Sequence, residues 1–162
     1  MKAHIRTRWL GLAAILGVTA MLAATARPAA KNMAVVVSSG SKLADLPLAD
    51  LVKLCKGTLK AWPDGKPFVL VVKEPDGAEM RAASLKLFGA SGSEAKAVIA
   101  KLNEVHPVVK VVESDEDLLR TVAATPGAVG IVDVYAINSA VKVLRLDGKL
   151  PFDLGYALKS NQ

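Results

Sequence analysis

The chain has 162 residues, with 21 lysines and arginines against 15 aspartates and glutamates, giving a formal net charge of +6. Nucleic-acid-binding surfaces usually combine clustered basic residues with stacking aromatics. Here the basic residues are scattered and only 4% of the residues are aromatic, so the composition argues against a nucleic-acid partner. A single cysteine, Cys55, excludes an intrachain disulfide.

The first 26 residues have the layout of a secretory signal peptide. Three basic residues precede an apolar run over residues 10–24, and Ala-Thr-Ala at 24–26 supplies small residues for cleavage. The run is shorter than the roughly 20 residues that cross a bilayer, which favours cleavage over a membrane anchor. Cleavage after Ala30 is an alternative. We therefore expect a periplasmic or secreted protein, whose net charge falls to +3 once residues 1–26 and their three basic side chains are removed.

Beyond a short linker over 27–32, apolar runs alternate with amphipathic stretches. Runs of β-branched residues predict buried strands, and apolar residues spaced i, i+3, i+4 and i+7 predict helices. Ser91 with Glu94 has the pattern of a capping box, and Ser114 precedes three acids that suit a helix start. In chain order, the predicted elements are a strand over 33–37, a helix over 47–56, a strand over 68–72, a helix over 78–87, a helix from the capping box to 104, a strand over 107–112, a helix over 115–124 and strands over 128–132 and 141–146.

Strands separated by helices argue for an α/β fold with a mixed sheet. We expect one domain over 33–150, because the roughly 136 residues after the signal suit a single core of common size. The partial alternation over 141–146 predicts an edge strand, and 151–162 is expected to be a loose C-terminal tail.

The sequence does not predict an enzyme. His106 precedes a proline at the end of a predicted helix, where the helix dipole favours it, and Cys55 lies on the apolar side of a helix as a core residue. No Gly-x-Ser-x-Gly elbow exposes a nucleophile, and no Cys/His pair has zinc spacing. We therefore predict no catalytic residue, no metal and no cofactor.

Several short motifs follow one another in an informative order: Val35-Val36-Val37-Ser38-Ser39-Gly40, Gly57, Trp62-Pro63-Asp64-Gly65, Val71-Val72-Lys73-Glu74-Pro75-Asp76-Gly77 and Thr125-Pro126-Gly127-Ala128-Val129-Gly130. This series resembles the lobes of type 2 periplasmic solute-binding proteins, particularly the phosphate-binding components of ABC transporters. The resemblance covers roughly residues 33–146. It implies a compact fold of the periplasmic-binding-protein-like type, with helices on a mixed sheet. The chain departs from the family in size, because only three predicted helices and a short strand lie between the strands over 68–72 and 128–132, so we expect a second lobe that is small or reduced.

The resemblance also implies a ligand site. Oxyanion sites use main-chain N–H groups at a helix start, backed by hydroxyls and a basic side chain. Where the family has Ser-Gly-Thr-Arg, this chain has Ala78-Glu79-Met80-Arg81, so only Arg81 keeps its type. The candidate ligand-binding residues are Ser38, Ser39, Gly40 and Arg81. The alternative is that the serines bond their own loop and Arg81 is a surface cation.

Two functions remain open at this stage. The first is an exported solute-binding-protein-like domain that binds phosphate or a similar small oxyanion for an ABC-type transport or sensing system, with a membrane transporter or sensor as partner. The second is a degenerate, ligand-free periplasmic protein-interaction module, because Glu79 would repel phosphate. Tyr135 and Asn138 are expected near the cleft, and Trp62 either stacks on a ligand or fills the core beside its turn.

Overall fold

The computed structural model describes residues 32–62 and 64–159, so the predicted signal peptide and nearly all of the linker lie outside the described residues. The elements, in chain order, are β1 (Met33–Ser38), β2 (Asp45–Leu46), α1 (Leu48–Cys55), β3 (Val69–Lys73), α2 (Arg81–Phe88), α3 (Ser93–Val105), β4 (Val109–Val112), α4 (Asp115–Ala124), β5 (Ala128–Asp133), the 3-10 helix η1 (Val134–Ala136), β6 (Val141–Val143) and β7 (Arg145–Leu146). Strands alternate with helices along most of the chain, which confirms the predicted α/β fold with a mixed sheet.

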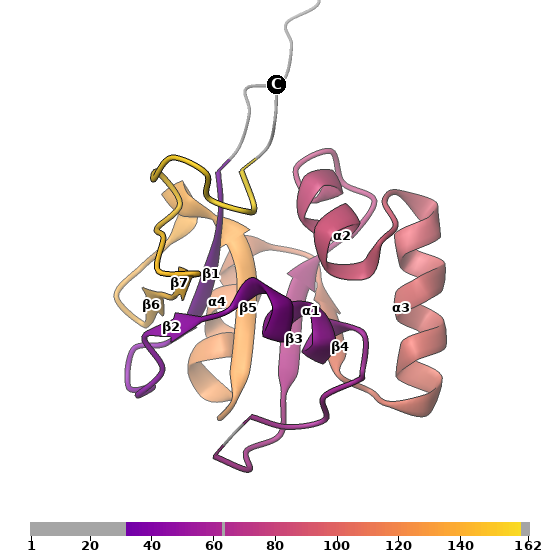
Figure 1. Cartoon of the computed structure of the whole chain (residues 1–162), viewed down its shortest axis with the longest axis horizontal. Helices are drawn as coiled ribbons and strands as arrows, with labels where there is room; N and C mark the ends of the chain where they lie inside the picture. The colour runs from indigo at the N-terminus through magenta and orange to yellow at the C-terminus, as the bar shows by residue number, and fades with distance from the viewer. Residues whose placement is uncertain (1–31, 63, 160–162) are drawn as a thin grey trace, which may run out of the picture.

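The main sheet has five strands in the order β4-β3-β5-β1-β6 (Figure 1). Strand β3 runs parallel to both β4 and β5, whereas β1 runs antiparallel to β5 and β6. In the register of the β1–β5 pair, Met33 faces Asp133 and Val37 faces Val129. The carboxyl end of β1 therefore lies at the amino ends of β3 and β5, which decides where the candidate site residues fall.

Each face of the sheet carries its own helices (Figure 1). Val35 and Val37 of β1 point into the larger core, which α1, α2 and α3 cover together with β2 and β7. Ala34 and Val36 point into the smaller core, which α4 covers. This alternation follows from the two-residue period of a strand. The result is a sheet buried on both faces, as the continuous apolar runs predicted.

Helix α4 packs very closely on β5, and Gly130 makes this approach possible. A Cβ atom at Gly130 would lie 2.6 Å from the Leu118 side chain and 2.9 Å from that of Val122. Ser114 caps α4 as predicted, since its hydroxyl accepts a hydrogen bond from the Asp117 N–H at 3.1 Å. The position of α4 is therefore fixed by a cap at its start and a glycine beneath it.

Two local predictions were wrong. The capping box at Ser91 does not form, because α3 begins at Ser93 and its N-cap is Gly92, which has no side chain to cap with. The stretch 141–146 is split rather than continuous. Its first part, β6, is an edge strand of the main sheet as predicted, whereas β7 pairs with β2 in a separate two-stranded sheet.

The segment after residue 150 is not loose where the structure describes it. The side chains of Tyr156 and Leu158 are 4% and 0% exposed and belong to the larger core. Phe152, Leu154, Tyr156 and Leu158 stand at alternate positions, but only Tyr156 and Leu158 are buried, and this contribution to the core was not predicted. Within residues 32–62 and 64–159, no helix is both long and apolar enough to cross a membrane.

Candidate functional site

The predicted ligand-binding residues fall at opposite ends of the sheet. Ser38, Ser39 and Gly40 follow the carboxyl end of β1, which we call the Ser38 end. Arg81 follows the carboxyl end of β3, at what we call the Arg81 end. Because β1 runs antiparallel to β5 while β3 runs parallel to it, the serine loop and Arg81 cannot form one site. The expectation of a single site was wrong, since strand direction in a mixed sheet cannot be read from apolar runs.

At the Arg81 end, β3 leads through a tight turn into α2. The N–H of Gly77 donates to the Glu74 carbonyl, and the buried Ser84 hydroxyl donates to the Pro75 carbonyl at 3.3 Å. Met80 is the N-cap of α2 and provides no side-chain cap. Helix α2 is therefore anchored to the turn, and its first-turn N–H groups lack a capping side chain.

Lys73 is the central charged group at this end. Its ammonium forms ion pairs with Glu79 and, at 2.8 Å, with Asp115, and its side chain is only 14% exposed. Burial alone would lower the pKa of Lys73, but the hydrogen bonds to Asp115 and Glu79 outweigh burial and raise this pKa above its usual value. Sequence reasoning treated Glu79 only as a repulsive charge and missed its partner, because Lys73 lies on β3, six residues earlier.

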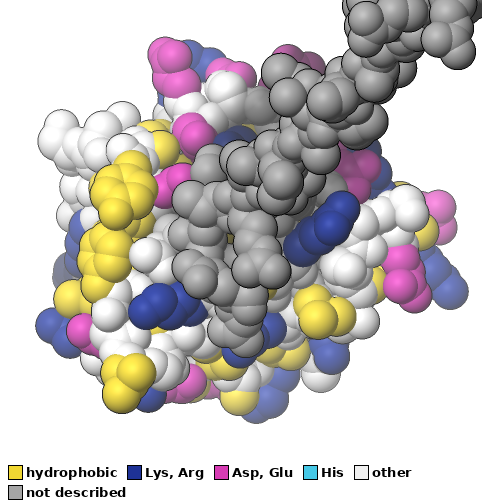
Figure 2. All heavy atoms as spheres, turned by 90° about the horizontal axis from the view of Figure 1, so that it is seen from above, with side chains coloured by type: hydrophobic (Ala, Val, Ile, Leu, Met, Phe, Trp, Pro, Cys, Tyr) yellow, Lys and Arg dark blue, Asp and Glu magenta, His cyan; other side chains and the backbone are white. Residues whose placement is uncertain are grey.

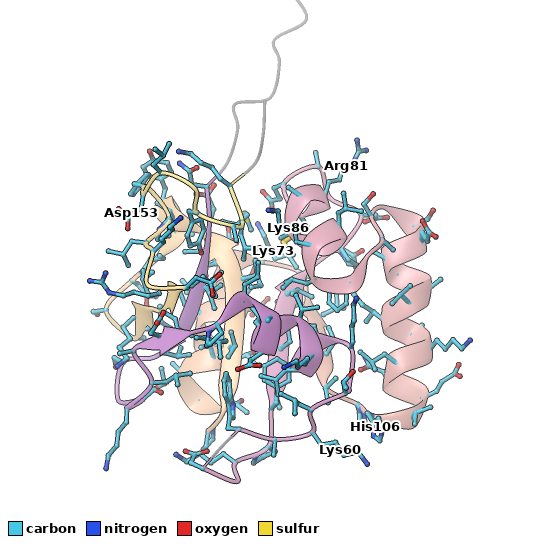
Figure 3. All side chains as sticks on the ribbon, in the orientation of Figure 1. Lys60, Lys73, Arg81, Lys86, His106 and Asp153 are labelled. Carbon is cyan, nitrogen blue, oxygen red and sulfur yellow. The ribbon has the colours of Figure 1, made fainter. Side chains whose placement is uncertain are left out.

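Arg81 and Lys86 add two exposed cations on α2. Figure 3 shows Arg81 pointing outward from the start of the helix, whereas Lys73 and Lys86 lie on the side of α2 that is nearer the sheet. Figure 2 looks onto this end and shows basic, acidic and hydrophobic side chains interspersed across the described surface. On the described part of this surface, the basic side chains therefore do not gather in one patch (Figure 2).

Tyr135 and Asn138, the two residues predicted to lie near a cleft, have different surroundings in the structure. Tyr135 follows β5 at the Arg81 end, is 83% exposed and has its ring 6.4 Å from that of Phe152. The Asn138 side chain accepts a hydrogen bond from the Ala140 N–H within its own loop. Asn138 leads into β6, whose first residue pairs with Ser38. The structure therefore does not bring these two side chains together.

The Ser38 end contains a cavity of about 540 Å³. Three parts of the chain line it: residues 37–43 without Ser39, the three side chains of Trp62, Asp64 and Lys66, and the end of α4 with the start of β5 over 123–128. Trp62 is buried, its indole N–H donates to the Gly127 carbonyl at 2.8 Å, and its ring meets Phe68 edge-on. The prediction that Trp62 fills the core beside its turn is confirmed, and Trp62 also forms part of the cavity wall.

The remaining candidates have structural roles. Cys55 is buried, and burial raises the pKa of its thiol to about 12, which keeps the thiol protonated and unreactive at neutral pH. His106 is the C-cap of α3, and Figure 3 shows it at the end of the molecule away from Arg81. Among the residues that the structure describes, no group of three or more His, Cys, Asp and Glu side chains could hold a metal ion.

Comparisons with known proteins agree with the fold. No family model matches the chain. Over 84 residues, 52% of this chain, it is 32% identical to phosphate-binding protein PstS 2 from two Streptococcus agalactiae strains, of serotypes V and III. The chain spans only 28% of the length of these relatives. It is therefore similar to part of a phosphate-binding protein.

Solved structures show the same architecture. An ABC-type phosphate transport receptor from Vibrio cholerae has a TM-score of 0.58 at 18% identity, covering 81% of this chain and 54% of its own. PstS from Borrelia burgdorferi has a TM-score of 0.58 at 14% identity, and the match covers 82% of this chain and 55% of the Borrelia burgdorferi chain. A putative phosphate ABC transporter substrate-binding protein with bound phosphate, from Clostridium perfringens, has a TM-score of 0.56 at 16% identity. That match covers 74% of this chain and 46% of the Clostridium perfringens chain. The chain thus has a periplasmic-binding-protein-like fold and spans about half of each of these structures.

Proposed function

We propose that this chain is an exported solute-binding-protein-like domain that takes a small oxyanion such as phosphate at the Arg81 end, for an ABC-type transport or sensing system. The observation that carries the proposal is Lys73, a partly buried cation at the carboxyl end of β3 beside the uncapped start of α2. Parallel strands commonly place ligands at their carboxyl ends. The names of the relatives support this ligand class, since they are phosphate-binding or phosphate-transport proteins.

Binding would require an exchange of anions at Lys73. Glu79 already contacts the ammonium, and a bound phosphate beside it would feel a like charge in a partly desolvated site. The ligand would displace Glu79 while Asp115 keeps its ion pair with Lys73. The α2 N-terminus supplies backbone donors, and Arg81, the first residue of this helix, adds a further cation at the same end of the sheet.

A thermal-shift titration with phosphate tests this proposal, because a ligand that binds only the folded state raises the melting temperature with its concentration. Potassium chloride at matched ionic strength controls for charge screening. We expect phosphate to raise the melting temperature of the original protein and to raise that of Arg81→Ala by less. Lys101→Ala removes an exposed charge on α3 and should show the same rise as the original protein. Glu79→Gln should strengthen binding because the competing carboxylate is removed.

The Glu79–Lys73 ion pair also favours a second candidate, a ligand-free interaction module in which Glu79 permanently fills the anion position. The same titration separates the two. If the original protein shows no shift and Glu79→Gln gains one, the position is a closed anion site. If neither protein responds to phosphate or sulfate, the oxyanion proposal for the Arg81 end fails.

A further inference from the structure

We propose that the cavity at the Ser38 end binds a zwitterionic small molecule with an apolar body, of which an α-amino acid with an apolar side chain is the simplest example. The cavity lies at the opposite end of the sheet from Lys73 and Arg81, so this inference does not rest on the oxyanion proposal. Its volume, about 540 Å³, falls within the roughly 300–1,000 Å³ typical of small-molecule sites.

The 38–43 loop supplies hydrogen-bond donors to this cavity. Two of its carbonyls are already engaged, because the Ser38 carbonyl accepts from the Ser41 N–H at 2.9 Å and the Ser41 carbonyl accepts from Lys142 Nζ at 2.6 Å. The N–H groups of Gly40 and Lys42 and the Lys42 ammonium bond no acceptor among the described residues. This loop therefore suits the carboxylate of a ligand.

The end of α4 supplies the opposite polarity. Ala123 and Ala124 line the cavity in the last turn of the helix, and their carbonyls accept no hydrogen bond from the described residues. The carboxyl end of a helix carries partial negative charge and favours cations. Asp64 and Lys66 line the same cavity but form an ion pair with each other at 2.7 Å, so the carbonyls at the end of α4 are the acceptors that this side offers. These carbonyls suit an ammonium group.

Apolar side chains complete the cavity. Val37 and Trp62 are buried residues of its wall, and Leu43 is packed against the same core. Inorganic phosphate would use only the donors and would leave both the apolar wall and the helix carbonyls without a partner. A molecule with a carboxylate, an ammonium group and an apolar chain matches all three parts of the wall at once.

Isothermal titration calorimetry of the whole protein with L-leucine and L-phenylalanine tests the proposal. We expect saturable binding of at least one of them, and at least about tenfold weaker binding of its N-acetyl and amide analogues, which lack the ammonium or the carboxylate. Lys42→Ala should weaken the amino acid by about tenfold, as expected for the loss of one charge-assisted contact. Lys42 is exposed, so this variant should fold, and Lys101→Ala is the matched control that should bind like the original protein.

Three results would overturn the inference: no binding of either amino acid up to about 10 mM, equal binding of analogues that lack one charge, or full affinity in Lys42→Ala. Phosphate binding that depends on Arg81 but not on Lys42 would support the oxyanion proposal alone. Amino-acid binding that depends on Lys42 and not on Arg81 would support the cavity alone, so a failure of one proposal is distinguishable from a failure of the other.

Discussion

Replacing Leu158 with alanine should destabilise the protein strongly, although only four residues of the sequence follow it. Its side chain is 0% exposed and belongs to the larger core, whereas Leu154 in the same segment is 94% exposed. Removing three buried carbon atoms costs about 0.8 kcal/mol for each methylene-sized group, or about 2.4 kcal/mol. The cavity left behind adds to this, so we expect a loss of about 3–4 kcal/mol, within the range measured for buried Leu→Ala changes.

The matched variant Leu154→Ala makes the same chemical change in water and should alter stability by less than about 0.5 kcal/mol. Urea unfolding followed by far-UV circular dichroism measures both variants. With an m-value of about 1–3 kcal/mol/M, Leu158→Ala should lower the midpoint by roughly 1–4 M. If the two variants unfold at the same midpoint, the segment after residue 150 does not belong to the core, and the packing of Tyr156 and Leu158 described above is wrong.

Two further changes probe backbone fit and buried ionisable groups. Gly127→Ala places a Cβ atom 2.3 Å from the Pro67 carbonyl oxygen, at a residue whose φ is +80°. We therefore expect this change to lower the free energy of unfolding, measured by thermal unfolding, by more than about 2 kcal/mol. Gly148 has a similar φ of +75° but lies in open space, so Gly148→Ala should lower the free energy of unfolding by only about 1–2 kcal/mol. If both changes cost the same, the contact with the Pro67 carbonyl is not the cause of the loss in Gly127→Ala. Burial raises the pKa values of Cys55 and Tyr156 from 9.0 and 10.0 to about 12 each, so the unfolded chain loses these protons first. The two protonated groups contribute their full stabilisation below pH 9, and this stabilisation is lost as the pH rises toward 12. Urea midpoints that stay constant from pH 8 to 11 would contradict this prediction.

The sequence predicted the elements well where the pattern is local. Apolar β-branched runs gave β1, β3 and β5, and the cap at Ser114 gave the start of α4, because these signals depend on neighbouring residues alone. The capping box at Ser91 failed because a glycine at the adjacent position set the helix start instead. The short strand β2 was missed, since two residues carry no period and its pairing with β7 joins segments 100 positions apart.

The candidate site was predicted less well than the fold. Arg81 was correctly placed at the start of a helix, but the ion pairs that Lys73 forms at this end of the sheet could not be read from the chain. Lys73 meets Asp115, 42 positions away, only because β3 and α4 pack together. Likewise, no local pattern indicates a cavity, which exists only where three separate segments fail to fill the space between them.

By itself, the sequence determined the class of fold, because hydrophobic periodicity and turn residues act over a few positions and dictate which stretches become strands and helices. Only the tertiary structure decided the direction of β1 against β5. That direction places Ser38 and Arg81 at opposite ends of the sheet and separates residues that were expected to form one site. Strand direction is set by connections and by packing over the whole domain, so the chemistry that side chains share follows from the assembled sheet rather than from any single motif.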